Sequence, residues 1–188
     1  MRKLGQLLTI LLVLGAVVSC ASRPRELTWL DYVGAEVQAM GYGNWIVIAD
    51  ASYPYQEVEG FRTIIATEEI PEVLDHVLKE MEKFQHTRPS FFVPRELRYI
   101  SNDQAPGIDF YRGELTEALH GYTPRGLELS ILENIVSESA KKYSVLVIKT
   151  TTTLPYSTVF LDLDSGYWDR AAEQELRARI LASNFQIQ

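Results

Sequence analysis

The segment that most constrains the fold runs from Gly41 to Pro54, because it holds a short, wholly apolar run, Ile46–Ala49, between glycines and a proline. Such a run suits a strand buried on both faces of a largely parallel sheet. One acid, Asp50, follows this run at its carboxyl end. Ligands of these sheets bind beyond the carboxyl ends of the strands, so Asp50 stands where a site is expected. An aspartate before a proline-containing loop can equally cap a turn, and at this point both interpretations stay open.

The start of the chain has the features of an export signal. Arg2 and Lys3 precede an apolar stretch over Leu7–Val18, which is too short to span a bilayer comfortably. This pattern predicts that residues 1–19 are a secretory signal peptide. Val17-Val18-Ser19-Cys20 resembles a bacterial lipobox. That resemblance implies cleavage before Cys20 and lipidation of its thiol.

The expected mature chain is an envelope lipoprotein. Residues 20–27 would then form the lipidated cysteine and a short tether, and residues 28–188 the domain. The resemblance to a bacterial lipoprotein also implies that Ala21, rather than aspartate, after the cysteine favours the outer membrane or the periplasmic face. An ordinary signal peptide with an unrelated cysteine, or an uncleaved anchor, is the alternative. Cys20 is the only cysteine, so no intramolecular disulfide is possible.

The charge of the chain excludes some partners. The formal net charge is −7, and loss of residues 1–19 removes Arg2 and Lys3 and no acid, which makes it −9. No basic cluster remains. Nucleic acid and anionic lipid surfaces are therefore poor partners, and membrane contact is expected through the lipid anchor alone.

Helical and strand patterns alternate along the rest of the chain. The spacing of apolar residues predicts helices over residues 29–40, 70–84, 110–119 and 130–143, and a last helix after Asp169 with Ala172, Leu176, Ile180 and Leu181 on its apolar side. Strands are expected over residues 46–49, 62–66, 91–93, 145–148 and 157–163, with 97–100 as a continuation of the third or a separate strand. Ser130 and Glu133 form a predicted capping box. This alternation predicts a single α/β domain with a mostly parallel sheet flanked by helices.

Motifs of the commoner enzyme classes are missing. Gly41 and Gly43 lack the third glycine and the helix of a phosphate-binding loop. His76, His86 and His120 are scattered, and none has a carboxylate at metal-ligand spacing. Ser52, Ser157 and the threonine run 150–153 have no histidine nearby in sequence, so a hydrolase triad has no support. We expect neither a metal nor a cofactor.

A second informative segment runs from Lys149 to Asp162. Pro155 fixes the start of a strand, and Tyr156 follows it at the strand's beginning. A tyrosine hydroxyl there can exchange hydrogen bonds with a sugar hydroxyl, although the ring can also simply cap the sheet edge. Asp162 and Asp164 alternate with apolar residues, so they are expected on one face, toward water.

Together the two segments resemble the D-ribose pyranase/L-fucose mutarotase family. The resemblance rests on Gly-x-Gly-x-x-Ile-Val-Ile-Ala-Asp-Ala-x-x-Pro near the start and Pro-Tyr before the last strand, and spans most of residues 28–163. It implies an α/β domain that assembles into a ring, often a decamer, and that interconverts anomers or ring forms of a free monosaccharide without cofactor or metal. Gly41, Gly43, Ala51, Pro54 and Pro155 match framework positions.

The resemblance also assigns site residues. Asp50 matches the aspartate of the family and Tyr156 its tyrosine, and both are expected in catalysis and substrate binding. Tyr42 stands where the family has histidine and becomes a candidate acid. Thr158 stands where the family has asparagine. Thr158 and Lys149 are expected to bind substrate.

Other positions depart from the family pattern. Asn44 replaces an aspartate, and Thr150-Thr151-Thr152 stands where Thr-Gly-Glu is common. A histidine titrates near neutral pH, whereas an unperturbed tyrosine has a pKa near 10, so Tyr42 would be a poorer base. The alternatives to a mutarotase are therefore a non-catalytic sugar- or glycan-binding lipoprotein on the same fold, and a structural lipoprotein whose ring assembly is its function.

Overall fold

The computed structural model describes residues 28–184. The predicted signal peptide, the lipidation of Cys20 and the tether over residues 20–27 all lie outside the described residues. Within residues 28–184, no helix combines the length and the apolar character needed to cross a bilayer.

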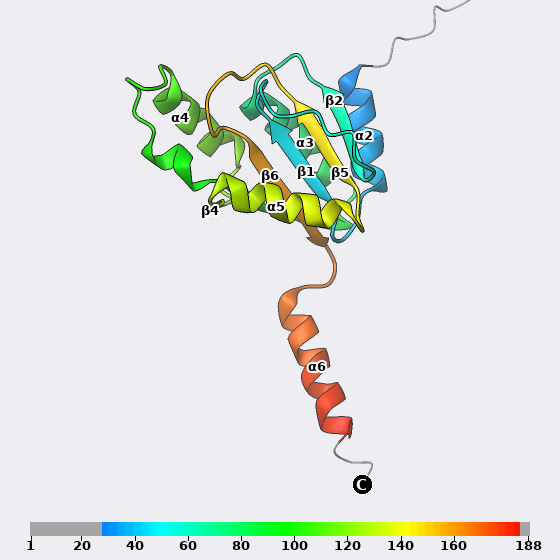
Figure 1. Cartoon of the computed structure of the whole chain (residues 1–188). Helices are drawn as coiled ribbons and strands as arrows, with labels where there is room; N and C mark the ends of the chain where they lie inside the picture. The colour runs from blue at the N-terminus through cyan, green and yellow to red at the C-terminus, as the bar shows by residue number, and fades with distance from the viewer. Residues whose placement is uncertain (1–27, 185–188) are drawn as a thin grey trace, which may run out of the picture.

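A six-stranded sheet in the order β2-β5-β1-β6-β3-β4 forms the centre of the domain (Figure 1). Strand β6 pairs antiparallel with both β1 and β3, while the other neighbours pair parallel, so β6 alone runs in the opposite direction. The expected single α/β domain with a mostly parallel sheet is confirmed. The strands are β1 (Trp45–Ala49), β2 (Phe61–Ile65), β3 (Thr87–Pro94), β4 (Arg125–Leu127), β5 (Val145–Lys149) and β6 (Val159–Ser165).

Helices cover both faces of this sheet, which is why β1 can be apolar throughout. Ile46 and Ile48 point into a core formed with α2 (Trp29–Ala39), α3 (Ile70–Glu82) and α4 (Ile108–Ala118). Trp45, Val47 and Ala49 point to the other face, where α5 (Leu129–Ala140) packs. Every residue of β1 is buried. The prediction of a strand buried on both faces is confirmed.

Helix α3 forms as its sequence predicts. Pro71 lies in the first turn, where its missing N–H costs nothing. The Glu72 carboxylate accepts a hydrogen bond from the backbone N–H of Glu69 at 3.2 Å, which satisfies a donor before the first turn. Val73, Leu74 and Val77 on the inner face are fully buried.

Two elements that follow α3 differ from expectation. The predicted strand at residues 97–100 is instead part of a 3₁₀ helix, η2 (Arg95–Tyr99). The Arg112 guanidinium binds the carbonyls of Leu97 and Ile100 at 2.7 and 3.1 Å, so those carbonyls are not available to a sheet. The short edge strand β4 was not predicted, because three residues are too few to show a periodicity.

The start of α5 also differs from the predicted capping box. The helix begins at Leu129, with Glu128 as its cap, so Ser130 lies inside the first turn and caps nothing. The first N–H of the helix is instead bound by a side chain distant in sequence. The Glu96 carboxylate accepts the Leu129 N–H, with oxygens at 3.1 and 3.3 Å. A cap supplied by η2 cannot be recognised from the local sequence.

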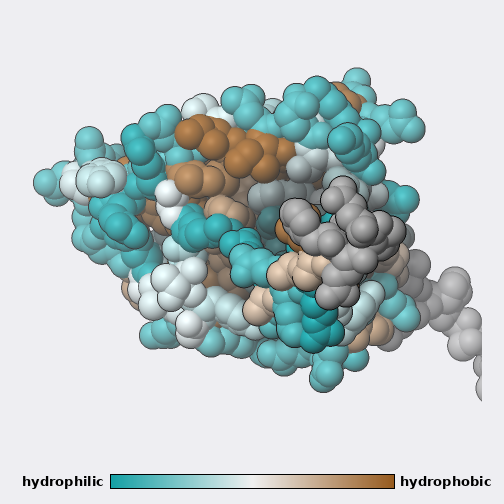
Figure 2. Space-filling view, turned by 90° about the horizontal axis from the view of Figure 1, so that it is seen from below, coloured by the Kyte–Doolittle hydropathy of each residue, from teal (hydrophilic) through white to brown (hydrophobic). Residues whose placement is uncertain are grey.

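The last helix, α6 (Arg170–Asn184), lies away from the sheet in Figure 1. Its expected apolar side is not buried, since Leu176, Ile180 and Leu181 are 40, 43 and 61% exposed. Glu173–Arg177 and Glu175–Arg179 ion pairs run along its surface. Figure 2, seen from this end of the molecule, shows a mostly hydrophilic surface with one prominent apolar patch and smaller apolar areas elsewhere.

Candidate functional site

The reversed direction of β6 brings the two informative segments together. Ile48 near the end of β1 pairs with Val159 at the start of β6. The carboxyl end of β1 and the start of β6 therefore lie side by side at one end of the strands, here called the Asp50 edge of the sheet. Asp50 and Thr158, which are 108 residues apart in sequence, are in direct contact there.

The Asp50 carboxylate is held by two neighbouring side chains. Thr158 Oγ1 donates to Asp50 Oδ2 at 2.8 Å. The Ser52 backbone N–H and hydroxyl donate to Oδ1 at 2.9 and 2.5 Å. A carboxylate has about four lone-pair sites, so one, on Oδ2, is left for a ligand. The turn-capping interpretation of Asp50 is thus correct for Oδ1, and it does not exclude a role for Oδ2.

Tyr156 lies in the turn that leads into β6. Its φ of 57° is in the left-handed region, which is unfavourable for a residue with a side chain. Neighbouring contacts hold the turn: Ser157 Oγ donates to the Leu154 carbonyl at 2.7 Å, and Tyr111 Oη donates to the Ser157 carbonyl at 2.5 Å. These contacts explain why β6 begins at Val159 rather than at the predicted Ser157. The Tyr156 side chain is 40% exposed, so its hydroxyl remains available to a ligand.

The end of β5 completes this edge. Lys149 pairs with Ala49, the residue before Asp50, and is half-buried. The threonines after it act as structural links: Thr150 Oγ1 donates to the Ala49 carbonyl at 2.9 Å, and Thr152 Oγ1 accepts the N–H of Ile70 at 2.9 Å. Hydrogen bonds from the threonine run therefore connect this end of the strands to the start of α3.

An open pocket of about 370 Å³ adjoins Asp50, a size in the range of small-molecule sites. Its walls come from two loops, one following β1 and the other preceding β6. They comprise Asp50, Ala51, Ser52, Thr153, Leu154 and Pro155.

Tyr42 does not lie at this edge. It precedes β1 whereas Asp50 follows it, so the two residues are at opposite ends of a buried strand. At about 3.3 Å per residue, that strand separates them by well over 15 Å. The structure thus brings Asp50 and Thr158 into contact, and it places Lys149 and the turn that holds Tyr156 at the same end of the strands. Tyr42 lies elsewhere. This separation follows from the predicted strand at 46–49, which lies between the two residues, and it limits what the family resemblance implies for Tyr42.

Sequence reasoning missed two buried tyrosines near the site. Tyr53 is 6% exposed, and burial, with the nearby charges of Glu133 and Asp50, raises its pKa to about 12. Burial likewise raises the pKa of Tyr111, and the charges of Asp50 and Glu69 act in the same direction. Both rings therefore stay neutral hydrogen-bonding groups. Neither a tyrosine in a loop, such as Tyr53, nor one in a helix, such as Tyr111, carries a sequence signal that separates it from an exposed tyrosine.

The fold and this edge together define the class: an α/β domain with the D-ribose pyranase/L-fucose mutarotase fold, as the sequence resemblance predicts. The structure of Bacillus subtilis RbsD complexed with D-ribose has a TM-score of 0.52 and 14% identity, over 76% of this chain and 97% of that one. The likeness establishes the fold.

Two further solved structures are similar at lower TM-scores. The fucose mutarotase from Streptococcus pneumoniae in complex with L-fucose has a TM-score of 0.47 and 25% identity, over 69% of this chain and 89% of that chain. FucU from Bifidobacterium longum has a TM-score of 0.49 and 16% identity, over 73% and 98%. No family model matches the chain, and no curated protein matches it by sequence.

Proposed function

We propose that this protein binds a free monosaccharide at the Asp50 edge and accelerates the interconversion of its anomers or ring forms. The observation that carries the proposal is the hydrogen bond between Asp50 and Thr158, together with a pocket lined by Asp50 and by the loop that leads to Tyr156. It is supported by the fold, since the solved structure of Bacillus subtilis RbsD, which has the same fold, is a complex with D-ribose.

The chemistry requires one base and one acid. A base takes the proton from the anomeric hydroxyl, the bond between the anomeric carbon and the ring oxygen breaks, and an acid protonates that oxygen. The open-chain aldehyde then rotates and closes on its other face by the reverse steps. Asp50 Oδ2 is the base or the group that orients the anomeric hydroxyl, and Tyr156 donates to a sugar oxygen. Lys149 and Thr158 help to hold the sugar and the carboxylate.

Tyr42 can join this chemistry only from a second copy of the chain. We therefore propose a homo-oligomer, a ring by resemblance to the family, in which Tyr42 of one copy approaches Asp50 of another. Mixing Asp50→Asn and Tyr42→Phe variants tests this arrangement. Heteromers formed after unfolding and refolding together should regain activity, because some sites then hold both native residues. A monomer by light scattering, or a mixture as inactive as its components, would contradict it.

The test of the activity is NMR saturation exchange between anomers of a panel of pentoses and hexoses. Asp50→Asn should lower the rate by about 10²–10⁴-fold, the usual contribution of a positioned acid or base. Asp103→Asn is the matched control, since Asp103 is an exposed acid in the loop before α4. If the exchange rate of no sugar in the panel rises above its rate in buffer, the proposed activity is refuted.

A sugar-binding protein without turnover is the second candidate. It is favoured by the occupancy of Asp50, because Ser52 and Thr158 already fill three acceptor positions of its carboxylate. Calorimetric titration that finds sugar binding, together with exchange spectra identical to those of the sugar alone, would establish it. A sharp loss of exchange rate in Asp50→Asn would exclude it.

We propose that the protein is exported and lipid-anchored to the cell envelope. The support is the sequence around Cys20, which places the only cysteine at the lipobox position. Metabolic labelling with a radiolabelled fatty acid should mark the native chain and not Cys20→Ser. Equal labelling of both would refute lipidation at this residue.

A further inference from the structure

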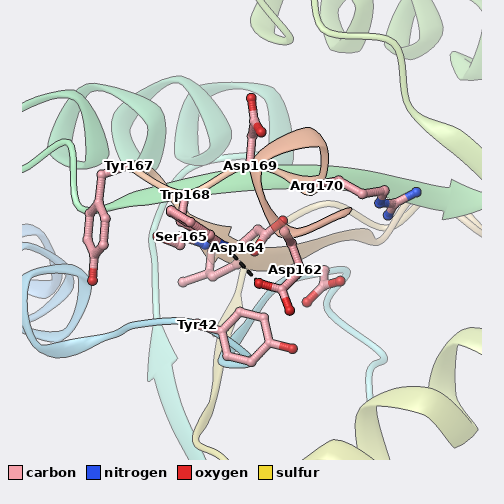
Figure 3. Close-up of a pocket in the computed structure, with 11 residues that line it drawn as sticks. Tyr42, Asp162, Asp164, Ser165, Tyr167, Trp168, Asp169 and Arg170 are labelled. Carbon is pink, nitrogen blue, oxygen red and sulfur yellow. Dashed lines mark hydrogen bonds between the residues drawn. The ribbon is translucent and has the colours of Figure 1, made fainter. Parts of the chain in front are cut away.

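Helix α6 is exposed to solvent along most of its length. Every residue from Gln174 to Ser183 is exposed. Figure 3 shows the connection to the domain, from Asp164 at the end of β6 to Arg170 at the start of the helix, with the Arg170 side chain directed away from Asp164. An isolated helix of 15 residues is marginal in water, because most helical stability in proteins comes from packing of an apolar face. A packing partner is therefore expected for α6.

The beginning of α6 is capped by a side chain and braced by another. Asp169 Oδ1 accepts the Ala172 N–H at 2.7 Å, which satisfies one of the free donors of the first turn. Trp168 Nε1–H donates to Glu173 Oε2 at 2.9 Å. The helix thus begins at a defined residue, and the side chains along it have fixed positions on its faces.

One face of α6 carries an apolar stripe that fits a second copy of itself. Ala172, Leu176 and Ile180 follow one another at i, i+4 spacing and so lie on one side of the helix. Leu176 and Ile180 are 40 and 43% exposed. A small residue stands four positions before Leu176 and a large one four positions after it. Two helices that cross antiparallel at Leu176 therefore place each Ala172 opposite the Ile180 of the other copy, so that small and large side chains interdigitate.

The charges beside the stripe favour the antiparallel direction. Glu173 and Arg177 form an ion pair on one side of it, and Glu175 and Arg179 form one on the other. On each side the acid precedes the base. Antiparallel helices related by a two-fold axis bring the same sides together with their directions reversed, so each acid approaches a base of the other copy. A parallel pair would bring opposite sides together, with the two acids adjacent and the two bases adjacent, which is unfavourable.

The composition of α6 favours a second copy over a lipid surface. Helices that lie on membranes combine a strongly basic polar face with a broad face of large apolar side chains. The three arginines of α6 are opposed by two glutamates, which leaves a formal charge of only +1. The stripe has two large apolar side chains, Leu176 and Ile180, beside an alanine. Alternating charge of this kind suits a protein partner that carries the same pattern in reverse.

We infer that α6 of one copy packs antiparallel against α6 of a second copy, with the two Leu176 side chains in contact at a two-fold axis. Such an interface uses the same surface of both copies and closes once two of them have met. The inference goes beyond the proposed sugar chemistry and does not depend on it, because α6 contains no residue of the Asp50 edge.

The test is disulfide cross-linking of the full chain carrying Cys20→Ser, in which an introduced cysteine is the only thiol. Leu176→Cys should form a covalent dimer on mild oxidation, seen on a non-reducing gel. Gln174→Cys, on the opposite side of the helix, is the matched control for random encounters and should stay a single chain. Absence of a Leu176→Cys dimer, or an equal yield from both variants, would overturn the inference. So would a Leu176→Cys thiol that only lipid vesicles, or the chain's own domain in a monomer, protect from maleimide.

The direction of the pair is tested by mixing Ala172→Cys and Ile180→Cys chains before oxidation. These positions face each other in the antiparallel pair, so the mixture should cross-link. Neither variant should do so alone, since at 1.5 Å per residue the two like positions lie about 12 Å apart along the axis, beyond the reach of a disulfide of about 7 Å. A dimer of Ile180→Cys alone, without one in the mixture, would show a parallel pair and refute the arrangement.

Charge variants test the flanking residues on the Leu176→Cys chain. Replacing both Arg177 and Arg179 by Glu, or both Glu173 and Glu175 by Arg, should abolish cross-linking in each variant alone, and mixing the two should restore it. Cross-linking that neither replacement diminishes would refute the charge pairing. Asp50→Asn on the same chain should cross-link fully, because the readout requires no sugar and no activity, so this inference and the proposed function can fail separately.

Discussion

Thr158 contacts Asp50 twice: its Oγ1 accepts the Asp50 backbone N–H at 3.2 Å and donates to Asp50 Oδ2 at 2.8 Å. One hydroxyl thereby fixes both the backbone and the carboxylate of the candidate site. Because Thr158 is 1% exposed, water cannot take its place.

Removal of this hydroxyl should destabilise the fold measurably. Thr158→Val keeps the shape of the side chain but leaves the Asp50 N–H and one carboxylate position unpaired, so we expect a loss of about 1–3 kcal/mol in the free energy of unfolding in urea. A double-mutant cycle with Asp50→Ala isolates the pair, with a coupling energy of at least about 0.5 kcal/mol. Additive effects would show that the two side chains do not stabilise each other.

Tyr156 allows function and strain to be separated. Tyr156→Phe keeps the left-handed φ and removes only the hydroxyl, so stability should be unchanged while anomer exchange falls. Tyr156→Gly also removes the hydroxyl but relieves a backbone strain of about 1–2 kcal/mol. We therefore expect the glycine variant to be equally inactive, yet more stable in urea than the phenylalanine variant. Full activity in either variant would exclude Tyr156 as a donor.

Stability should fall at alkaline pH through Tyr53. Its pKa is raised in the folded state to about 12 from 10.0, so its contribution is complete below pH 10 and is lost as the pH rises toward 12. The loss amounts to about 2–3 kcal/mol at most. Tyr53→Phe should flatten the pH profile of the unfolding free energy. Tyr111, whose pKa is also raised, leaves a residual slope. Tyr167→Phe, at a side chain 83% exposed, is the control and should leave the profile unchanged.

Two glycines with similar backbone angles should respond differently to alanine. Gly60 has φ 96°, and a Cβ there would lie 2.2 Å from the Ala140 carbonyl oxygen. Gly107 has φ 94°, and a Cβ there meets nothing within 4 Å. Gly107→Ala should therefore cost only the left-handed strain, about 1–2 kcal/mol. Gly60→Ala should cost at least twice as much in urea unfolding, because α5 would have to move away from the loop before β2. Equal losses of unfolding free energy would mean that the loop or α5 shifts to accept the Cβ at Gly60 without further loss of stability.

The sequence predicts best those elements that are defined by their own composition. The runs at 46–49 and 145–148 are apolar enough to be central strands in any pairing, and α3 is specified by its periodicity and its first turn. The capping of α5 by Glu96 and the 3₁₀ geometry of η2 depend on partners elsewhere in the fold. Neither is visible in a local window of sequence.

The candidate site was partly predictable for the same reason. Asp50 could be identified because it ends a buried strand. Its pairing with Thr158 required the direction of β6, which the alternation of helices and strands does not reveal. The position of Tyr42 is visible in the sequence, because the buried strand β1 (Trp45–Ala49) separates it from Asp50 and puts the two residues at opposite ends of the sheet.

The place of β6 also bears on how the chain folds during synthesis. The last strand in sequence lies between β1 and β3 and joins β2-β5-β1 to β3-β4. Until residues 159–165 leave the ribosome, the two halves have no hydrogen bonds across the sheet, and both β1 and β3 have an open edge. Pairings this distant in sequence form slowly and leave intermediates prone to association. The nascent protein therefore cannot close its sheet until residues 159–165 have been synthesised, and until then β1 and β3 remain open to pairing with other chains.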